Sequence, residues 1–441
     1  MNFKKTHFLK TLFAVLLILF SAKSAHADGI QITSYDMKII LSQPNDGYLY
    51  IDLTCGVLKS DTTSLCVLLF NSGARISSIA FLDSNVSVNP SFHFKGTDTL
   101  LIQLPAEAKY RYSFKLLFNY AFPISMTDSS ILMLDRGHRW YPLIADCIAS
   151  VKLNAQVPEG CEVLSTGDLI NKTSSNGKST YIWESSMPVF KIPLIVFKAE
   201  LYNHASIKSG DKEIVLYTLA KYDTANTALL NEAGNVFKFC TENIGEYSYK
   251  RLILLEFPEF EGMNIGSGIV EIGSSYIDLM KHGFFDGLRL VIAQQWIGAG
   301  VFAKLGEPGF WFLSLSLPHY VRLMYVRQSA GQEAYNKDIQ GQLGKYEEFA
   351  GKENDVPILD VDFPNTKEKG LVLYAKGPYA LSLLHKQMGD ERWFDFLKSL
   401  YADYRGKILT YDAFREMLSC FDDGTTIPLL DKLVKEKGLP E

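Results

Sequence analysis

The stretch Val291-Ile-Ala-Gln-Gln-Trp-Ile-Gly298 lies within a very apolar segment that runs from residue 283 to residue 317. The charged side chains of this segment are few: they are Asp286, Arg289, Lys304 and Glu307. A helix that is apolar on nearly all sides is buried inside its domain. The segment therefore predicts one or two buried helices.

The chain on both sides of this segment also carries helical patterns. Helices are predicted near residues 369–389, 391–404, 410–420 and 427–437. Thr410 has the residue type that favours the N-cap of the third of these helices. Before the apolar segment, residues 224–246 carry a helical pattern, and Arg251-Leu-Ile-Leu-Leu-Glu-Phe257 is typical of a strand. We therefore predict a second, mostly helical domain over residues 206–441.

Residues 28–205 are predicted to form an antiparallel β-sandwich. Between Ser150 and Val157, apolar and polar residues alternate, which is typical of a strand with one buried face. Further short apolar runs lie at residues 76–81, 99–103, 110–118 and 195–201. Turn-forming stretches separate such runs, as at Pro44-Asn-Asp-Gly47 and Ser174-Ser-Asn-Gly177. Many short strands with turns between them indicate a sandwich.

Several groups of residues occur in an order that resembles the landmarks of a known family. They are Arg139-Trp-Tyr-Pro142, Asp146, Pro158-Glu-Gly160, Phe257-Pro-Glu-Phe-Glu-Gly-Met-Asn-Ile-Gly-Ser-Gly-Ile-Val270, Val291-Ile-Ala-Gln-Gln-Trp-Ile-Gly298, Leu373-Tyr-Ala-Lys-Gly377 and Gly389-Asp-Glu-Arg-Trp-Phe394. Over residues 110–420 their order and spacing are similar to those of peptidase family M1, the aminopeptidase N-like zincins. The resemblance implies an α+β multidomain protein, with an N-terminal antiparallel β-sandwich followed by a thermolysin-like (gluzincin), mostly helical domain.

The resemblance also implies a zinc-binding helix, but this chain lacks the residues that would bind zinc. Two imidazoles at positions i and i+4 lie on one helix face and bind a single Zn²⁺. Aligned on Trp296, these positions carry Leu290 and Gln294, and Val291 stands where the family has its general base. Leucine and valine neither coordinate a metal nor accept a proton, and a neutral amide is a poor zinc ligand beside imidazole.

The third zinc ligand of the family, a Glu, is missing as well. Its position falls at one of three neighbouring residues, Phe312, Leu313 or Ser314, and we assign it to Ser314. No carboxylate occurs between Glu307 and Glu333. The resemblance therefore indicates a degenerate member of the family that lacks the zinc-binding motif, and we expect no cofactor.

Gly262, Met263 and Asn264 resemble the family motif that binds the free amino terminus of a peptide. The family has a Glu at the third of these positions, whereas Asn264 accepts a hydrogen bond without a charge to match an ammonium group. Glu261 and Glu271 are near in sequence and are candidates to replace it. The alternative is that both lie on a solvated or edge face.

Tyr374 resembles the catalytic tyrosine of the family, whose hydroxyl stabilises the oxyanion of the tetrahedral intermediate. That role requires a metal-activated water. Because the zinc ligands are missing, we expect Tyr374 to be retained in position without operating in catalysis.

Residues 1–27 are predicted to be a signal peptide. A positively charged start is followed by nine apolar residues, Leu12 to Phe20, and by the cleavage pattern Ala25-His-Ala27. Nine apolar residues are too few to span a bilayer, so we expect no stable membrane anchor. The segment is of the bacterial type and predicts an exported protein, either periplasmic or secreted. In such a protein Cys55 and Cys66 are either a disulfide across a hairpin or two buried thiols.

The composition narrows the class of protein further. The 441 residues are 47% hydrophobic and 21% charged, which excludes a mainly disordered chain. The formal net charge of −5 gives no electrostatic footprint for nucleic acid. No G-x-S-x-G, Walker A or G-x-G-x-x-G motif occurs, and none of the eight His forms an i, i+3 or i, i+4 pair.

Three functional hypotheses follow from these observations. The first is an exported, catalytically inactive aminopeptidase-like protein that uses the former cleft to bind a peptide or protein partner. The alternative is an active zinc metalloaminopeptidase whose ligands have been displaced. The third is a purely structural module of the cell envelope, which would have its cleft filled by side chains. We favour the first, a pseudoenzyme, over an enzyme.

Overall fold

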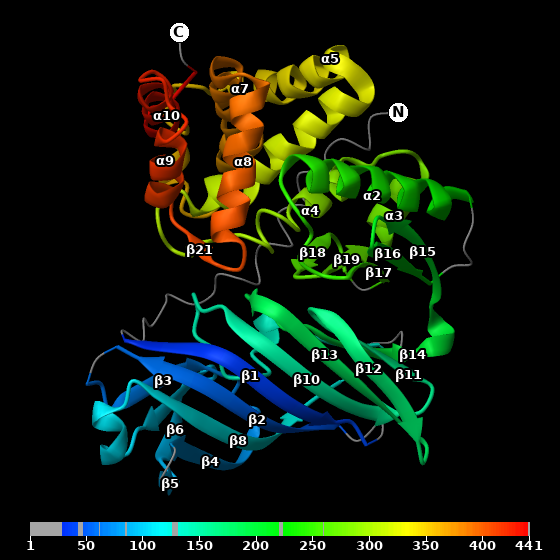
Figure 1. Cartoon of the computed structure of the whole chain (residues 1–441), viewed down its shortest axis with the longest axis vertical. Helices are drawn as coiled ribbons and strands as arrows, with labels where there is room; N and C mark the ends of the chain where they lie inside the picture. Colours follow the sequence, from blue (N-terminus) through cyan, green and yellow to red (C-terminus); the bar gives the residue numbers. More distant parts are fainter. Residues whose placement is uncertain are drawn as a thin grey trace.

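The computed structural model describes residues 29–42, 47–60, 62–83, 86–125, 131–219, 224–258 and 260–439. A β-rich domain is followed by a mainly helical domain, and the two are stacked along the long axis of the molecule (Figure 1). This architecture confirms the predicted fold class. The predicted signal peptide and most of the predicted turn at residues 44–47 lie outside the described residues.

The largest sheet of the described residues belongs to the first domain and has the strand order β12-β13-β10-β1-β2-β8-β4-β5. The strands are β1 Ile30–Ile40, β2 Tyr48–Lys59, β4 Arg75–Asp83, β5 Val86–Val88, β8 Ser113–Pro123, β10 Ala149–Pro158, β12 Asp168–Ser175 and β13 Lys178–Val189. Adjacent strands pair antiparallel, except that β1 and β10 run parallel. In β2, alternate residues from Leu49 to Val57 are buried, because successive side chains point to opposite faces.

Two three-stranded sheets complete this domain within the described residues, with the orders β3-β7-β6 and β11-β14-β9. Their strands are β3 Leu65–Leu69, β6 Ser91–Lys95, β7 Thr99–Gln103, β9 Ile131–Leu134, β11 Cys161–Leu164 and β14 Leu194–Lys198. The apolar faces of the three sheets form one continuous buried cluster. Sheets that pack face to face over a shared apolar core make a β-sandwich, as predicted.

The hairpin proposed for Cys55 and Cys66 is wrong. Cys55 lies in β2, which pairs with β1 and β8, whereas Cys66 lies in β3, which pairs with β7. The chain passes from one sheet to another between the two residues instead of turning back within one sheet. Both thiols are buried and free, which is the second of the two alternatives.

The second domain is built on a five-stranded sheet with the order β15-β16-β17-β19-β18. The strands are β15 Asn203–Ser209, β16 Lys212–Thr218, β17 Arg251–Phe257, β18 Met263–Gly266 and β19 Ile269–Gly273. The middle strands β16, β17 and β19 run parallel, and the edge strands β15 and β18 are antiparallel to their neighbours. β17 is buried along nearly its whole length, as expected of a central parallel strand. The expected domain boundary, between residues 205 and 206, falls inside β15.

Helices make up most of the remaining second domain and share one large apolar cluster with the sheet (Figure 1). They are α2 Thr224–Asn243, α3 Ser274–Lys281, α4 Asp286–Ala293, α5 Leu317–Glu347, α6 Lys367–Leu371, α7 Gly377–Met388, α8 Asp390–Tyr404, α9 Tyr411–Ser419 and α10 Thr426–Lys435. Thr410 caps α9 as predicted, because its hydroxyl accepts a hydrogen bond from the backbone N–H of Ala413. Between α4 and α5, β20 Phe302–Ala303 pairs with β21 Ile408–Leu409, which precedes α9. Within the described part of the chain, no helix has the length and apolar character needed to cross a membrane.

Two π-helical turns pack against each other in the second domain. η5, Phe312–Ser316, leads into α5, and η7, Val372–Lys376, leads into α7. The Ser316 hydroxyl donates to the backbone carbonyl of Leu373 at 2.8 Å. Gly377 allows this close approach, because a Cβ atom there would lie 2.2 Å from the Ser316 Oγ atom. A π-helical turn adds one residue to a helix and frequently occurs at a functional site.

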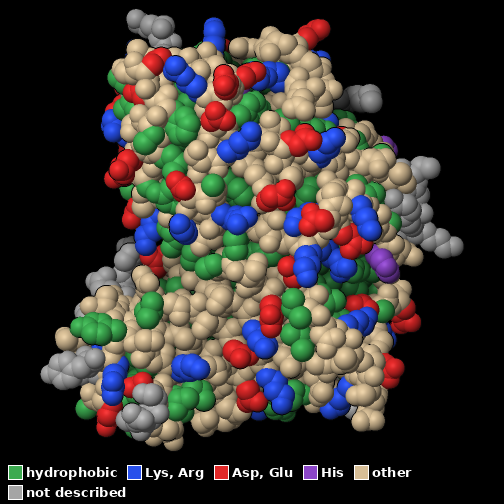
Figure 2. Space-filling view, viewed as in Figure 1, with side chains coloured by type: hydrophobic (Ala, Val, Ile, Leu, Met, Phe, Trp, Pro, Cys, Tyr) green, Lys and Arg blue, Asp and Glu red, His purple; other side chains and the backbone are tan. Residues whose placement is uncertain are grey.

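The molecular surface carries charges of both signs. On the face seen in Figure 2, basic and acidic side chains are intermixed over both domains. A mixed surface of this kind produces no extended field of a single sign on that face.

Candidate functional site

A cavity of about 180 Å³ lies between the two domains, where β18, α4 and the two π turns meet the loop that joins β13 to β14. Its apolar lining includes Met263, Ile265, Leu290, Val291, Phe302 and Trp311. Its polar side chains include Lys191, Asn264, Ser267, Gln294, Ser314 and Tyr374. Among the described residues, Lys191 is the single charged side chain of the lining.

The structure brings together seven of the eight site positions inferred from the sequence. The residues that line the cavity are Met263, Asn264, Leu290, Val291, Gln294, Ser314 and Tyr374. Gly262 is outside the lining and supports the start of β18, because its carbonyl accepts a hydrogen bond from the Gly273 N–H at 2.8 Å. The functional roles of these positions stay predictions, whereas their proximity is a property of the fold.

One side of the cavity, here called the helix wall, consists of Leu290, Val291, Gln294 and Ser314. The backbone N–H of Gln294 donates to the Leu290 carbonyl at 2.9 Å, so these two side chains lie one helical turn apart on the same face. The Gln294 Nε2 atom donates to the Ser314 backbone oxygen at 3.1 Å. The Ser314 hydroxyl donates to the carbonyl of Phe310 at 2.7 Å. Gln294 and Ser314 thus each donate a hydrogen bond to a backbone carbonyl of the protein.

The helix wall does not fit a zinc ion. Leu290 and Val291 are buried apolar side chains, and Gln294 and Ser314 contribute no imidazole, thiolate or carboxylate. Throughout the described residues, no three His, Cys, Asp or Glu side chains gather in a way that could hold a metal. Of the three residues considered for the third ligand position, Ser314 lines the cavity, whereas Phe312 and Leu313 belong to the apolar core.

Tyr374 lies in the middle of η7 and is part of the lining. Its ring meets the ring of His319 edge-on, with 5.5 Å between the centroids. Burial, and secondly the neighbouring Tyr276, raise the pKa of Tyr374, so its hydroxyl is protonated at neutral pH. Within the described residues, this hydroxyl forms no hydrogen bond with another group. It is therefore an unused hydrogen-bond donor on a residue that lines the cavity.

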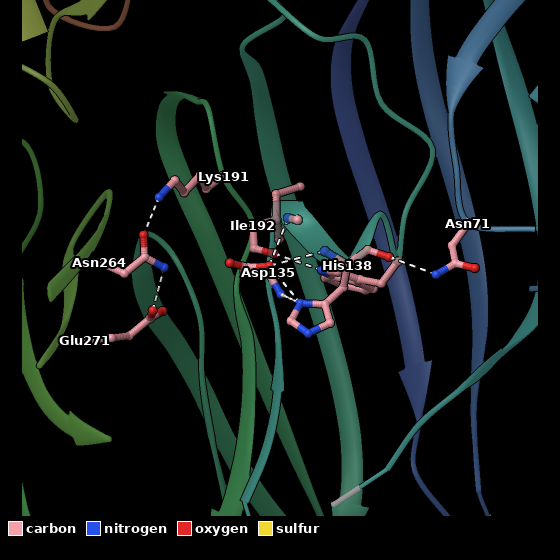
Figure 3. Close-up of polar contacts among 9 residues, drawn as sticks. Asn71, Asp135, His138, Lys191, Ile192, Asn264 and Glu271 are labelled. Carbon is pink, nitrogen blue, oxygen red and sulfur yellow. Dashed lines mark hydrogen bonds and ion pairs between the residues drawn. The ribbon is translucent and has the colours of Figure 1, made fainter. Parts of the chain in front are cut away.

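The other side of the cavity is formed by Lys191 and Asn264, and Glu271 lies behind Asn264, outside the lining. These three residues are here called the strand wall. The Lys191 Nζ atom donates to Asn264 Oδ1 at 2.5 Å, and Asn264 Nδ2 donates to Glu271 Oε2 at 2.6 Å (Figure 3). Asn264 and Glu271 are directly opposite each other on the paired strands β18 and β19. The amide of Asn264 thus bridges a cation on the first domain's loop and a carboxyl group in the second domain's sheet.

Glu271 is buried, and its interpretation as a residue of a solvated or edge face is wrong. It is 2% exposed, because β19 is an inner strand between β17 and β18. Burial raises the pKa of Glu271 to about 7, with a further increase from Asp135, while Lys191 and Asn264 act in the opposite direction. The carboxyl group is therefore close to half protonated at neutral pH. Glu261, the other candidate, is exposed.

The loop that carries Lys191 is hydrogen-bonded to the rest of the first domain on both sides of this residue. The Arg136 guanidinium donates to the Phe190 carbonyl at 2.6 Å and lies 3.9 Å from the centre of the Phe190 ring. The Trp140 indole donates to the Ile192 carbonyl at 3.2 Å. Both neighbours of Lys191 in the chain are therefore anchored through their backbone.

Asp135 and His138 form a second polar group close to the strand wall (Figure 3). The Asp135 Oδ1 atom lies 2.7 Å from His138 Nδ1, at the 3-10 turn η3, Arg136–His138. Burial is the largest influence on the pKa of Asp135 and acts to raise it, but the hydrogen bonds and charge of His138, together with the charge of Lys191, outweigh burial and hold this pKa below its usual value. The same hydrogen bond raises the pKa of His138. Asp135 is thus a carboxylate at neutral pH.

Lys191 is the residue of this site that the sequence interpretation missed. It is the sole charge in the apolar run Pro188 to Phe197. A lone cation inside a buried run needs a polar partner, and this is the signal that would have identified it. Its partner, Asn264, is distant in sequence, so the pair emerges only from the fold.

The fold of the chain is similar to that of known structures, although its sequence has no recognisable relative among family profiles or curated proteins. Its two-domain architecture is nevertheless that of the M1 zinc metallopeptidases, and the similarity extends over nearly the whole chain. At sequence identities of 14–16% the likeness defines the fold.

The particular structures come from a bacterium and a yeast. The M1 zinc metallopeptidase from Deinococcus radiodurans superposes with a TM-score of 0.75 and 16% identity, covering 94% of this chain and 96% of that chain. A mutant of the Deinococcus protein bound to a Tyr-Ser-Ala substrate gives a TM-score of 0.74 with 16% identity and the same coverage. Native yeast LTA4 hydrolase gives 0.73 with 14% identity, covering 93% of this chain and 69% of that chain.

Proposed function

We propose that the protein is an exported, catalytically inactive protein of the M1 type whose cavity binds a peptide or a segment of a partner protein. The observation that carries this proposal is the composition of the helix wall. A zincin generates its nucleophile from a water bound to zinc, which requires two imidazoles, a carboxylate ligand and a base. None of these groups is supplied by Leu290, Val291, Gln294 or Ser314. The two polar side chains among them each donate a hydrogen bond to a backbone carbonyl.

The cavity supports binding in place of catalysis. It is concave, mostly apolar and equipped with a few polar groups, which is the usual construction of a ligand site. It is not filled by side chains, which argues against a purely structural role. The Deinococcus structure with Tyr-Ser-Ala illustrates that this fold accommodates a short peptide.

A paired measurement of metal content and peptide hydrolysis tests the inactive half of the proposal. We expect purified mature protein to contain much less than one zinc per chain and to leave Tyr-Ser-Ala intact. One zinc per chain together with chelator-sensitive cleavage would establish the alternative, an active metalloaminopeptidase with displaced ligands.

Titration calorimetry with the same tripeptide and with longer peptides tests the binding half. Ala303 lines the cavity and is partly buried, so Ala303→Leu should fill part of the space and weaken binding. Ala205→Leu is the matched control, because Ala205 is also partly buried, lies in a strand and packs against the same apolar cluster away from the cavity. Equal effects of the two substitutions would remove the cavity from consideration as the binding site.

A further inference from the structure

The charge inside the cavity has the opposite sign to that needed for a peptide amino terminus. Lys191 is the single charged side chain of the lining among the described residues. Glu271, whose carboxyl group lies nearby, is not part of the lining and is separated from Lys191 by the amide of Asn264. An ammonium group entering the cavity would therefore first meet another ammonium group, and like charges repel.

The hydrogen bonds within the strand wall also disfavour an ammonium group as the ligand. Asn264 Oδ1, the acceptor that an ammonium group would use, already accepts a hydrogen bond from Lys191. The amide nitrogen of Asn264 is bonded to Glu271. Lys191 has three N–H donors, and in the described residues its one hydrogen-bond acceptor is Asn264. Tyr374 adds a second available donor to the lining. The cavity thus offers donors to a ligand that brings acceptors.

The position of Lys191 is preorganised for such a ligand. The backbone carbonyls of Phe190 and Ile192 are fixed by Arg136 and Trp140, so the lysine is presented from a rigid loop. Rigid presentation reduces the entropy lost on binding. Burial lowers the pKa of Lys191, and Asp135 and Glu271 counteract this effect. An anion bound at the amino group would further favour its charged form.

The other residues of the lining limit the size and the polarity of the ligand. Leu290, Val291, Met263 and Trp311 are apolar, and the volume of about 180 Å³ is close to that of engineered apolar cavities of about 150 Å³, which bind benzene. The space therefore suits one apolar side chain of leucine or phenylalanine size. A larger ligand would have to continue out of the cavity.

We infer that the cavity recognises a carboxylate carried on a compact apolar body, and specifically the C-terminal carboxylate of a peptide with an apolar last residue, with Lys191 as its counter-ion. This inference rests on the proposed function and deepens it by naming the end of the peptide that is bound. The charge-assisted hydrogen bond from Lys191 distinguishes the acid from its amide. A free arylalkyl carboxylic acid shares this chemistry and is the second source that the experiment separates.

The experiment measures the binding of four probes to the wild-type protein by titration calorimetry. They are acetyl-Gly-Ala-Phe with a free C-terminus, the same acetylated peptide as its C-terminal amide, the unacetylated C-terminal amide, and 3-phenylpropionate. We expect the free-acid peptide to bind about tenfold to a hundredfold more tightly than either amide, the range of one hydrogen bond to a charged group. This comparison needs no variant and so does not depend on the folding of one.

Two substitutions assign the effect to the lysine. Lys191→Met should reduce the affinity for the free acid to that for the amide, whereas Lys191→Arg should retain a preference for the acid. Lys198→Met is the matched control, because Lys198 is an exposed lysine at the end of β14, and it should leave all affinities unchanged.

The outcomes separate this inference from the proposed function. Equal binding of acid and amides, or tighter binding of the peptide with a free amino group, would overturn the inference while the proposed peptide binding stands. Binding of 3-phenylpropionate alone would support carboxylate recognition and overturn peptide binding. Absence of binding by all four probes would overturn both.

Discussion

The helix wall and the strand wall border the same cavity but differ in how their polar groups are satisfied. In the helix wall, Gln294 donates to a backbone carbonyl, and its neighbours Leu290 and Val291 are apolar. In the strand wall, Lys191 and Glu271 are ionisable and are joined through a single amide. The first wall is electrically neutral at any pH, whereas the second changes its charge near pH 7.

This difference indicates which wall of the cavity carries the ionisable groups. A zinc site needs imidazole, thiolate or carboxylate ligands, and the helix wall contains none of them. Here the groups that titrate and the groups that select a ligand by charge belong to the strand wall. Substitutions in the two walls should therefore have different signatures: losses of packing or of neutral hydrogen bonds in the helix wall, and effects that depend on pH in the strand wall.

The strongest perturbation of the helix wall is to give it the residues of a zinc site. The combined substitutions are Leu290→His, Val291→Glu, Gln294→His and Ser314→Glu. Each polar group that is left unpaired in this apolar wall costs about 1–3 kcal/mol, so without metal the free energy of unfolding should fall by about 4–12 kcal/mol. Zinc that binds the folded state alone would restore part of this loss.

Chemical unfolding with a chelator and with added zinc measures both effects. The two-histidine variant, Leu290→His with Gln294→His, is the control, with a smaller loss and weaker zinc dependence expected. If the variant with all four substitutions were as stable as wild type in the presence of chelator, the description of this wall as mainly apolar would be contradicted.

The strand wall should make stability depend on pH through Glu271. Its pKa is 4.5 ordinarily and about 7 in the folded protein. The group therefore adds no penalty below pH 4.5, destabilises the fold progressively as pH rises from 4.5 to 7, and levels off above 7. The total loss is about 3 kcal/mol.

Free energies of unfolding measured from pH 4 to pH 8 test this prediction. Glu271→Gln should flatten the profile between pH 4.5 and 7 relative to wild type, because a neutral amide does not titrate. Glu261→Gln, at an exposed position, serves as the control and should reproduce the wild-type profile. Parallel profiles of wild type and Glu271→Gln would show that Glu271 has an ordinary pKa.

The contact between the two π turns should set the shape of the helix wall. In Gly377→Ala the new Cβ atom would approach the Ser316 Oγ atom to 2.2 Å, and the resulting overpacking should destabilise the protein by about 1–3 kcal/mol. Ser316→Ala removes that oxygen and should reduce the effect of Gly377→Ala in the double variant. Additive losses in a double-mutant cycle would mean that the two residues do not interact.

The smallest effect is expected for Gln294→Leu. It removes the hydrogen bond to the Ser314 carbonyl, which contributes about 0.5–1.5 kcal/mol, and replaces the amide with an apolar group of similar size. The affinity for carboxylate probes should stay unchanged, because the substitution lies in the neutral wall. Thermal unfolding and titration calorimetry check the two statements. A loss of binding comparable with that of Lys191→Met would contradict the division between the walls.

The elements with strong periodicity were predicted correctly from the sequence. The alternation between Ser150 and Val157 corresponds to β10, and the apolar run Arg251 to Phe257 corresponds to β17. Thr410 caps its helix as expected. In each of these cases the determining interactions are local: side-chain alternation, a continuous buried run, or a hydroxyl three residues from its partner.

The errors concern interactions between elements. The polar stretch between Cys55 and Cys66 indicates a change of direction but not that β3 joins a different sheet. Glu271 is a charged residue in a strand, and its burial depends on β18 and β17 flanking that strand. Lys191 and Asn264 belong to different domains and meet only when the domains are assembled. The order of the sequence motifs, in contrast, identified seven positions that lie together in the lining, although Gly262 is outside it and Lys191 was missed.

The two π turns have a consequence for chain length. Successive residues of an α-helix are rotated by about 100°, so the extra residue in η5 offsets the side chains before it from those in α5. Deleting one residue of η5 would regularise that helix, turn Ser314 away from its present direction and leave the partner turn η7 mismatched. Single deletions should therefore be harmful and a matched pair, one in each turn, better tolerated. The contour of this cavity is thus set by residue count as well as by residue identity, and homologues with shortened turns would have a differently shaped cavity even with identical side chains.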